Sequence, residues 1–329
     1  MFWERNTVLL LLSFLSSINC LPQQIPLQWS DQSPVNTSLL NDPFSDWTFH
    51  ETYHPLREVE QYIHTVAAFR SDSVKLDYIG WSNEKRPLTA LSITHADKTK
   101  KKLKKTIKKP AFVIMGAQHA REWIATSAAL YIAHTLLLDK KNPHSINKLL
   151  DDFSEQGYGW EPSSSPHEGP CAPWYPGEYP FQAPEVRALA DYFNNTKDIV
   201  AFIDLRSYGQ MISIPYSYSC DTMPRDAEDI LEAAYGAAAA SKAVHGLSMK
   251  VGQLCNTLYR APGNVVDWMY EENHVKYSYA VHLRDTGTYG YVLPTRHIKP
   301  AGEETAGLIS YLAKFILEDL EFCVQPCNS

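Results

Sequence analysis

The sequence lacks an excess of positive charge, a long apolar segment beyond its start, and any internal repeat. Its 30 lysines and arginines face 37 aspartates and glutamates, so the formal net charge is −7 and the isoelectric point is near 5.9. This balance excludes bulk attraction to nucleic acid. No segment approaches the roughly 20 apolar residues that span a bilayer. We therefore expect neither a nucleic-acid partner nor an integral membrane protein.

The first 20 residues have the organisation of a secretory signal peptide. Arg5 precedes an apolar run over residues 8–15, and small and polar residues follow up to Cys20. The run is too short to span a bilayer, so a cleaved signal at 1–20 is predicted. The mature chain is then expected outside the cell or in the lumen of a vacuole.

A polar spacer at 21–45 and one domain at 46–329 are expected to follow. Predicted strands alternate with predicted helices, which indicates an α/β fold with a mixed, mostly parallel-core sheet sandwiched by helices. Apolar runs and alternating patterns predict strands at 74–81, 88–95, 111–115, 199–205 and 277–284. Helical spacing and good helix formers predict helices at 53–69, 120–138, 185–193, 226–245, 264–270 and 303–320.

Secretion would place the chain in an oxidising compartment. Two glycosylation sequons, at Asn36 and Asn194, suit that route. Loss of Cys20 would leave five cysteines, and an odd number in a secreted protein leaves one thiol unaccounted for. A lysine-rich run at 98–109 is interpreted as a solvated loop, with a polyanion-binding patch as the alternative.

Two candidate zinc ligands follow a predicted buried strand. His119 and Glu122 lie three residues apart in GAQHAREW, directly after the apolar run AFVIM. Zinc accepts histidine nitrogen and carboxylate oxygen as ligands, and a catalytic site keeps one position open for water. Many helices carry the same pair on their surface, so two ligands alone do not define a catalytic site.

Four motifs occur in order along the chain: GAQHAREW, FIDLRSYGQ, LYRAPGNVVDW and YSYAVHLRDTGTYGYVLP. Together they resemble the zinc carboxypeptidases of the carboxypeptidase A/B type, over about residues 47–316. The resemblance implies a mixed eight-stranded sheet between helices and the removal of one C-terminal residue from a peptide. It also implies zinc as the cofactor, a glutamate as the general base, and a peptide C-terminus as the partner of a monomer.

The resemblance assigns roles to the residues that match these motifs. His119 and Glu122 match the first two zinc ligands, and Arg121 between them matches a substrate contact. Ser207 and Tyr208 match the dipeptide beside the third ligand.

The pocket for the C-terminal side chain is also implied by the resemblance. Tyr259 matches the tyrosine that closes over the substrate, and Val266 matches the residue at the base of the specificity pocket. A valine there suits apolar C-terminal side chains.

Two positions depart from the family pattern at the reacting centre. Arg206 occupies the third ligand position, and its guanidinium stays protonated and has no lone pair for zinc. His282 occupies the position of the general base and cannot place a carboxylate beside a metal-bound water. Losing both groups should leave little activity. We expect Arg206 to pair with Glu122 in place of the metal, and we doubt that two ligands retain zinc.

A third departure is a missing segment near 153–157. In the family this segment carries a central strand, the asparagine–arginine pair that grips the substrate carboxylate, and the arginine that stabilises the oxyanion. It also carries the usual partner of Cys171, which explains the odd number of cysteines. The resemblance then implies one disulfide between Cys220 and Cys255, with Cys323 and Cys327 as a second candidate pair. Either the gene sequence omits an exon, or the chain lacks a strand and exposes two unpaired edges inside its sheet.

Three hypotheses follow. The favoured one is a secreted pseudoenzyme that binds peptide C-termini or cell-wall components, similar to the fungal inactive metallocarboxypeptidase-like proteins linked to the cell wall. The second is an active zinc carboxypeptidase, specific for apolar C-terminal residues, in which His282 serves as the third ligand. The third is a truncated, non-productive gene product.

Overall fold

The computed structural model describes residues 8–12, 43–44, 47–94, 110–116, 118–138, 142, 179–196 and 198–324. The strands are β1 (Val8–Leu12), β2 (Val74–Trp81), β3 (Pro87–Ile93), β4 (Ala111–Gly116), β5 (Ile199–Arg206), β6 (Met211–Ile214), β7 (Lys250–Gln253) and β8 (Tyr277–His282). The helices are α1 (Leu56–Phe69), α2 (Trp123–Leu137), α3 (Pro184–Asn195), α4 (Ala227–His245), α5 (Leu254–Thr257), α6 (Val265–Glu271) and α7 (Ile298–Val324). Two short 3-10 helices are η2 (Thr48–His50) and η4 (Thr295–His297).

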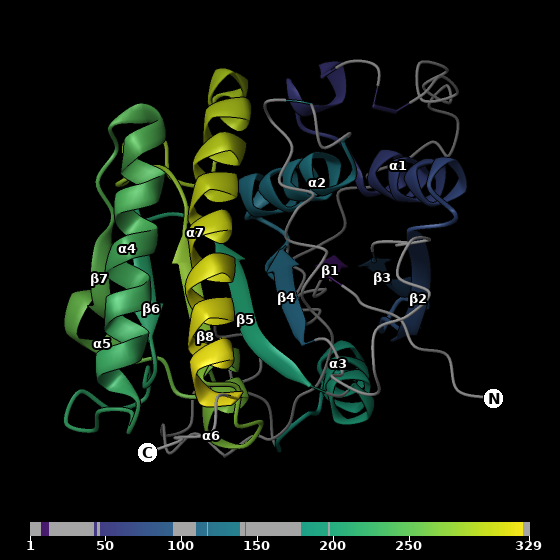
Figure 1. Ribbon diagram of the computed structural model, residues 1–329. Coiled ribbons are helices and arrows are strands. Elements are labelled where there is room, and N and C mark those ends of the chain that lie inside the picture. The colour runs from purple at the N-terminus through teal and green to yellow at the C-terminus, as the bar shows by residue number, and fades with distance from the viewer. Residues whose placement is uncertain are drawn as a thin grey trace, which may run out of the picture.

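The eight strands form one mixed sheet in the order β2-β3-β1-β4-β5-β8-β6-β7 (Figure 1). Strands β1, β4, β5 and β8 run parallel to their neighbours in that group, while β2 and β3 on one side, and β6 against β8 on the other, are antiparallel. Helices cover both faces. The predicted α/β fold with a mostly parallel core is therefore confirmed.

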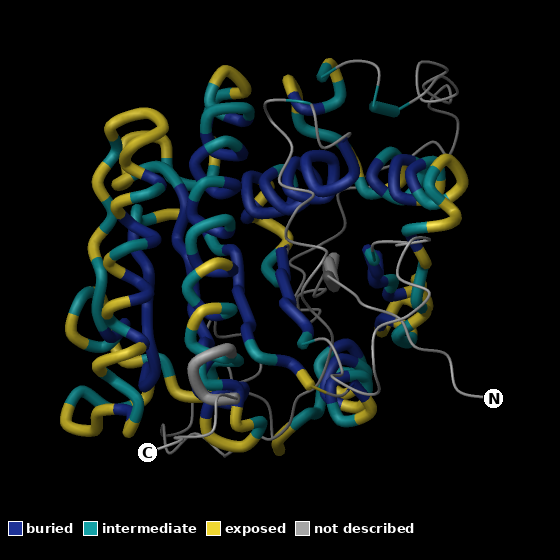
Figure 2. Tube along the Cα trace, viewed as in Figure 1, coloured by how far each residue is buried: buried dark blue, intermediate teal, exposed yellow. Residues whose placement is uncertain are grey.

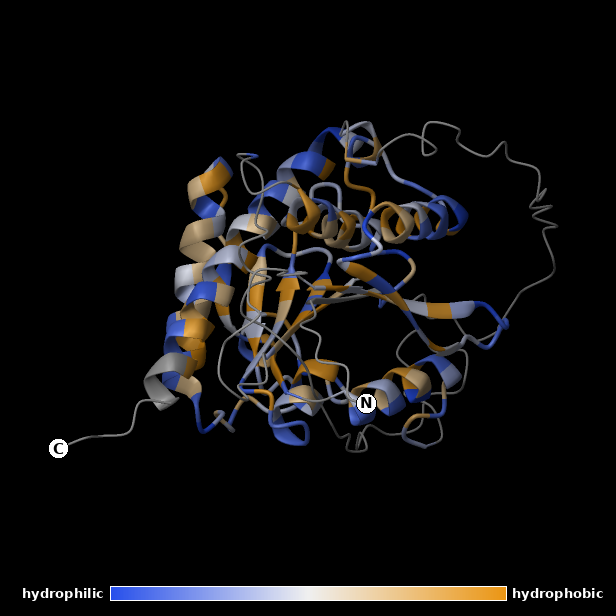
Figure 3. Cartoon of the chain, turned by 45° about the vertical axis from the view of Figure 1, so that its right-hand side comes forward, coloured by the Kyte–Doolittle hydropathy of each residue, from blue (hydrophilic) through white to orange (hydrophobic). Residues whose placement is uncertain are grey.

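Two apolar cores separate the sheet from its helices. One lies between the sheet and α1, α2, α4 and α7, and the other lies between the sheet and α3 and α6. Successive residues of β5 show the division, because Ile203 belongs to the first core and Phe202 to the second, as the two-residue period of a strand requires. Figure 2 shows the central strands buried, and Figure 3 shows apolar colour on the strands and on the inward helix faces.

Every residue of β4 and of β8 is buried, and so is nearly all of β5. Parallel strands covered on both faces need continuous apolar runs, which is why the sequence pattern locates them well. Because the three strands are parallel, their carboxyl ends meet at one edge of the sheet. The register confirms this, since Arg206 at the end of β5 is the partner of His282 at the end of β8.

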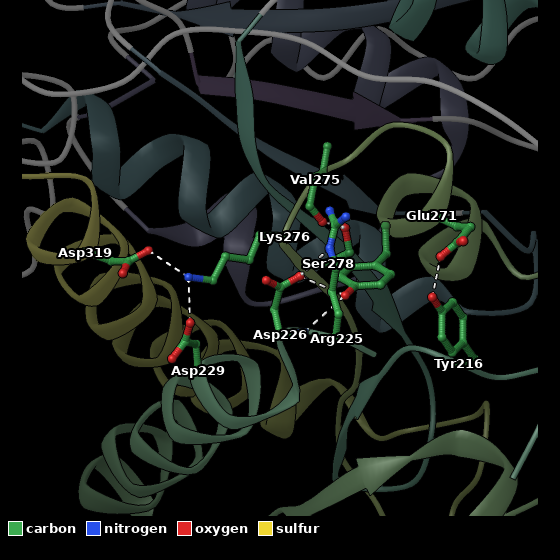
Figure 4. Close-up of polar contacts among 10 residues, drawn as sticks. Tyr216, Arg225, Asp226, Asp229, Glu271, Val275, Lys276, Ser278 and Asp319 are labelled. Atoms are coloured by element: carbon green, nitrogen blue, oxygen red, sulfur yellow. Dashed lines mark hydrogen bonds and ion pairs between the residues drawn. The ribbon is translucent and has the colours of Figure 1, made fainter. Parts of the chain in front are cut away.

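Polar contacts fasten two helices to the start of β8. The Lys276 ammonium lies 2.8 Å from an oxygen of Asp229 in α4 and 3.0 Å from an oxygen of Asp319 in α7 (Figure 4). The Tyr277 hydroxyl donates to the same Asp319 oxygen at 2.8 Å. On the other side, the Tyr216 hydroxyl bonds to Glu271 at the end of α6 (Figure 4). The strand that ends at His282 is thus held in place at its beginning.

Several helix ends differ from the prediction for local reasons. The first helix begins at Leu56 instead of residue 53, because the residue before Pro55 is kept out of the helical region. Helix α2 begins at Trp123 instead of residue 120, because Glu122 has non-helical dihedral angles. The prediction missed β6 and β7, which have four residues each and are too short to show a pattern.

The apolar run predicted as the core of a signal peptide forms a strand. Residues Val8–Leu12 are β1, which lies between β3 and β4 inside the sheet (Figure 1). One of the two alternatives for the missing segment is a sheet that lacks a central strand. The sheet of the described residues has no open gap, because β1 pairs on both sides.

Several predicted features lie outside the described residues. They are Asn36, Cys20, Cys171, the lysine-rich run at 98–109 and the junction at 153–157. Within the described part of the chain, no helix is both long and apolar enough to cross a bilayer.

Candidate functional site

The carboxyl ends of β4, β5 and β8 bring the predicted site residues together. Strand β4 ends at Gly116, and the turn that follows carries His119 and places Glu122 directly before α2. Arg206 is the last residue of β5 and His282 the last residue of β8. Four predicted site residues from three separate segments of the chain therefore meet at one edge of the sheet.

Arg206 forms an ion pair with Glu122, as the sequence predicts. Its Nε donates to Glu122 Oε2 at 3.0 Å, and its Nη2 lies 3.5 Å from Oε1. Its Nη1 donates to Asp204 Oδ2 at 3.2 Å. The Ser207 backbone N–H adds a further bond to Glu122 Oε2 at 3.3 Å. We call Glu122, Asp204 and Arg206 the arginine–carboxylate cluster.

The cluster is almost removed from solvent. Glu122 is 2% exposed, Asp204 is 0% exposed, and the Arg206 side chain is 14% exposed. Burial raises the pKa of Asp204 to about 7, against the opposing charge of Arg206. Burial alone would lower the pKa of Arg206, but the charges of Asp204 and Glu122 raise it above its ordinary value. The guanidinium therefore stays protonated between its two carboxyl partners.

Asp204 is a site residue that sequence analysis missed. It lies two residues before Arg206 on β5, and residues at that spacing point to the same face of a strand. The sequence signal that could have identified Asp204 is an acidic residue within an otherwise apolar strand, two positions before an arginine.

The two histidines of the site are held neutral. Burial, followed by the charge of Arg206, lowers the pKa of His119 to about 4. The same two causes lower the pKa of His282 to about 4, although a hydrogen bond with the Tyr208 backbone acts in the opposite direction. The His282 side chain is buried, and its Nε2 has no hydrogen-bond partner among the residues that the structure describes.

The donor groups present do not fit a catalytic zinc ion. Of the three family ligand positions, only His119 and Glu122 carry zinc-binding groups, and Arg206 engages both Glu122 oxygens. Across the described ranges, no group of three His, Cys, Asp or Glu residues is placed to hold a metal. We therefore derive no reaction step through zinc.

Aromatic residues and one arginine form the outer rim of the site. The Arg121 guanidinium lies 4.5 Å from the centre of the Tyr291 ring, and the Tyr208 ring meets Tyr291 edge-on at 5.1 Å. The pKa of Tyr291 is raised, first by burial, and it also responds to Arg121, Glu122, Tyr208 and Tyr259. Two of the predicted substrate-binding residues, Arg121 and Tyr208, thus contact Tyr291, a residue that the sequence motifs did not single out.

A carboxylate holds the turn that carries this rim. Asp285 accepts hydrogen bonds from the backbone N–H groups of Gly287, Tyr289 and Gly290, at 3.1, 2.7 and 3.2 Å. Burial alone would raise the pKa of Asp285. The hydrogen bonds from these N–H groups together outweigh burial, so the pKa lies below its ordinary value. The loop between β8 and α7 is therefore fixed from within.

Two predicted substrate-binding residues are buried. Ser207 is 4% exposed and contributes its backbone N–H to Glu122. Val266 is 1% exposed and packs in the second core with Trp268 and Met269. Tyr259, in contrast, is 61% exposed. Tyr259 is therefore accessible to a ligand, whereas Val266 lies among core residues. The role of Val266 in substrate specificity stays a prediction.

The modification sites stay predictions as well. Cys220 and Cys255 are both free thiols, and Cys255 Sγ lies 3.2 Å from the Ser219 carbonyl. Burial, followed by a hydrogen bond with Cys220, raises the pKa of Cys255 to about 11, so the two sulfurs are neighbours. Asn194 lies in the last turn of α3 and is half-buried.

The chain is similar to known proteins over most of its length. The sequence profile described as zinc carboxypeptidase matches residues 59–154 and 156–307. The two matched segments are separated only by residue 155, which lies within the junction where a missing segment is predicted.

Relatives and solved structures show the same similarity. The inactive metallocarboxypeptidase ecm14 of Sclerotinia sclerotiorum is 30% identical over 84% of this chain and 56% of its own length. Carboxypeptidase A2 of Rattus norvegicus is 32% identical over 78% of this chain and 68% of its own length. Bovine thrombin-activatable fibrinolysis inhibitor, solved with tick carboxypeptidase inhibitor, has a TM-score of 0.67 and 27% identity over 83% of this chain and 100% of that chain. This chain spans about half the length of the fungal inactive metallocarboxypeptidases that it matches.

Proposed function

This chain belongs to the zinc carboxypeptidase family, and we propose that it is a pseudoenzyme in which the Arg206 guanidinium replaces the catalytic metal. The observation that carries the proposal is the pair of contacts between Arg206 and both oxygens of Glu122. One fixed cation stands where the family places another.

The cluster opposes zinc entry through its charge and its burial. A zinc ion that used Glu122 would have to displace Arg206, and the guanidinium would lose a nearly buried partner. Separating one partner from a buried ion pair costs about 3–5 kcal/mol, because the remaining charge is left uncompensated. Two remaining ligands, His119 and Glu122, are fewer than the three protein ligands of catalytic zinc sites.

The position of the general base leads to the same conclusion. A general base works best when its pKa lies near the operating pH. His282 has a pKa of about 4, because it is buried beside Arg206, and is therefore a weak base at neutral pH. The second hypothesis, with His282 as third ligand, has no support in the placement of the described residues.

The retained role that fits the site is recognition of a peptide C-terminus. Arg121 is exposed and offers a positive charge for a terminal carboxylate. The Tyr291 ring lies against its guanidinium, and the Tyr208 ring lies against Tyr291. The structural relative solved with a carboxypeptidase inhibitor supports a protein or peptide ligand for this fold. A monomer suffices for this role.

A role in cell-wall organisation follows by analogy with the fungal relatives named inactive metallocarboxypeptidases. Secretion, glycosylation at Asn36 and Asn194, and a Cys220–Cys255 disulfide belong to the same proposal. They rest on the sequence patterns alone.

An activity assay tests the proposal directly. The purified chain is incubated with added zinc and with N-blocked peptides that end in Phe or Leu, and the released amino acid is quantified by chromatography. We expect no release above the background of a Glu122→Gln variant. Turnover that disappears in Glu122→Gln and with a chelator would show an active enzyme.

A binding assay separates recognition from catalysis. Fluorescence anisotropy compares one labelled peptide as a free C-terminal acid and as a C-terminal amide. We expect the acid to bind more tightly, and Arg121→Gln to remove the preference. Arg86→Gln is the matched control, since Arg86 is an exposed arginine on the β2–β3 hairpin. Equal binding of acid and amide would contradict the role of Arg121.

A further inference from the structure

We propose that two exposed aromatic residues on the edge strand β2, Tyr78 and Trp81, form a binding platform for a neutral glycan. Strand β2 ends the sheet, and among the described strands only β3 pairs with it (Figure 1). The two side chains are 53% and 56% exposed, and their ring centres lie 5.3 Å apart at an interplanar angle of 67°. We call these residues the aromatic pair. Three strands separate β2 from β5, so this platform is distinct from the proposed site for a peptide C-terminus.

A β-bulge places both rings on one face of the sheet. Side chains three residues apart on a regular strand point to opposite faces. In β2 the register shifts between Tyr78 and Gly80, so Ile79 is an extra residue. The partners of the aromatic pair on β3 are Thr89 and Pro87, which are two residues apart and therefore share a face. The bulge thus brings together two rings that a regular strand would separate.

Contacts with α3 fix the bulge and the hairpin that follows it. A Cβ atom at Gly80 would lie 2.7 Å from the Cβ of Ala188, so the strand approaches α3 this closely only with glycine at this position. Glu185, buried at the start of α3, accepts a hydrogen bond from the Asn83 backbone N–H at 2.9 Å. The platform is therefore formed before a ligand binds, which reduces the entropic cost of binding.

Strand β2 is poorly suited to pairing with a strand of another chain. Sheet edges avoid such pairing through bulges and charged side chains. Strand β2 has both, because its bulge follows Tyr78 and the ion pair of Lys75 with Asp77 precedes it. A further β-strand is thus disfavoured as the occupant, and the faces of the two rings are the surface that a ligand can use.

The exposed area of the aromatic pair suits a small unit and not a folded protein. A whole aromatic side chain buries about 150–250 Å², so two rings that are about half exposed offer roughly 200 Å² together. A stable protein interface needs about 800 Å² from each partner. The flat face of a sugar ring or two covers an area of the size that the pair offers.

The charged side chains around the aromatic pair balance one another. The basic ones are Lys75, Lys85 and Arg86, and the acidic ones are Glu60, Asp77 and Glu84. Lys75 pairs with Asp77, and Arg86 lies 3.1 Å from Glu84. Burial raises the pKa of Glu60 in α1 and the charge of Arg86 opposes that shift, so these two side chains are neighbours. A surface without net charge is complementary to an uncharged ligand.

A neutral glycan meets these requirements of shape, area and charge. Its sugar rings have apolar C–H faces that stack on aromatic rings, and the hydroxyl groups at their rims bond to charged side chains such as those around the pair. Tyrosine and tryptophan combine a large apolar face with a polar group, which suits such a ligand. Rings inclined at 67° form a corner that contacts a sugar unit on two sides.

Calorimetric titration of the full chain tests the proposal. The probes are three uncharged hexasaccharides: cellohexaose, laminarihexaose and chitohexaose. We expect at least one of them to bind, with the same affinity in the Arg121→Gln variant, because the peptide site is separate. Absence of binding by all three would overturn the proposal. Loss of binding in Arg121→Gln would place the glycan at the peptide site and would also overturn it.

Variants of the two rings locate the platform. We expect Tyr78→Ala and Trp81→Ala each to weaken glycan binding at least about tenfold, as for an aromatic anchor of an interface. Tyr78→Phe keeps the ring face and should bind like the parent. Tyr235→Ala is the matched control, because Tyr235 is a tyrosine of α4 that is 59% exposed. Thermal unfolding verifies that each variant is folded, and unchanged affinity in both ring-to-alanine variants would refute the platform.

Two further probes separate other classes of ligand. Decaproline represents the proline-rich peptides that dock on aromatic surfaces, and hexagalacturonate is an anionic oligosaccharide. We expect both to bind more weakly than the neutral hexasaccharide. Tighter binding of decaproline would show a peptide ligand, and tighter binding of hexagalacturonate would contradict the balance of charge, so either result would overturn the proposal.

Discussion

Removal of the Arg206 charge should destabilise the protein strongly. The variant Arg206→Met keeps much of the apolar stem and leaves Glu122 and Asp204, which are 2% and 0% exposed, without their cation. Breaking a buried pair by removing one partner costs about 3–5 kcal/mol. We expect a loss of that size in the free energy of unfolding, measured by urea denaturation at pH 8.

The pH dependence of this loss has a definite sign. The pKa of Asp204 is about 7 in the folded parent, so Asp204 is largely ionised at pH 8 and the loss of its cation costs most there. At pH 5.5 Asp204 carries a proton, one uncompensated charge disappears, and the loss should shrink. A loss that grows as the pH falls would contradict this electrostatic explanation.

Two comparisons isolate the buried pair. Arg86→Met removes an arginine that lies 3.1 Å from Glu84, with side chains 60% and 56% exposed, and should cost less than about 1 kcal/mol. In the double variant Arg206→Met with Glu122→Gln, no charge is left on residue 122, so the combined loss should be smaller than the sum of the single losses. An additive cycle, or an Arg206→Met loss equal to that of Arg86→Met, would refute the reasoning.

Three further predictions concern the surroundings of the cluster. The pKa values of His119 and His282 fall from 6.5 to about 4 on folding, so their contribution to stability is present above pH 6.5 and is lost as the pH falls through about 4. Urea denaturation from pH 8 to 4 should show this loss of unfolding free energy, and His282→Gln should reduce it. An unchanged pH dependence in that variant would argue against burial of the His282 ring. Asp285→Ala should lower the free energy of unfolding by about 1–3 kcal/mol and weaken peptide binding, because three backbone N–H groups lose their acceptor. An unchanged affinity for the peptide would show that this turn does not position the aromatic rim. Oxidative refolding should form a disulfide between Cys220 and Cys255, and peptide mapping without reduction would detect it. Alkylation of both thiols after such refolding would contradict the pairing.

The parallel core and the arginine–carboxylate pair could be predicted from the sequence. Strands such as β4 and β5 are buried on both faces, so their apolar runs are visible in the sequence. The pair of Arg206 and Glu122 was predictable because each residue falls in a motif that ends a strand of the same sheet.

The remaining features depend on contacts between distant segments. The burial of Asp204 follows from the packing of β5 between β4 and β8, which no local pattern reports. Tyr291 gains its importance from Arg121 and Tyr208, which lie far away in the sequence. The apolar run Val8–Leu12 becomes β1 only through its pairing with β3 and β4, which lie far away in the sequence.

The most direct test of the central claim is the zinc content of the purified protein at equilibrium with a known free zinc concentration, measured by elemental mass spectrometry on the parent chain and on Arg206→His. We expect the parent to hold far less than one zinc per chain, because Arg206 occupies Glu122, and the histidine variant to hold more, because it supplies a third ligand. One tightly held zinc per parent chain would contradict the claim that Arg206 is the cation of the site.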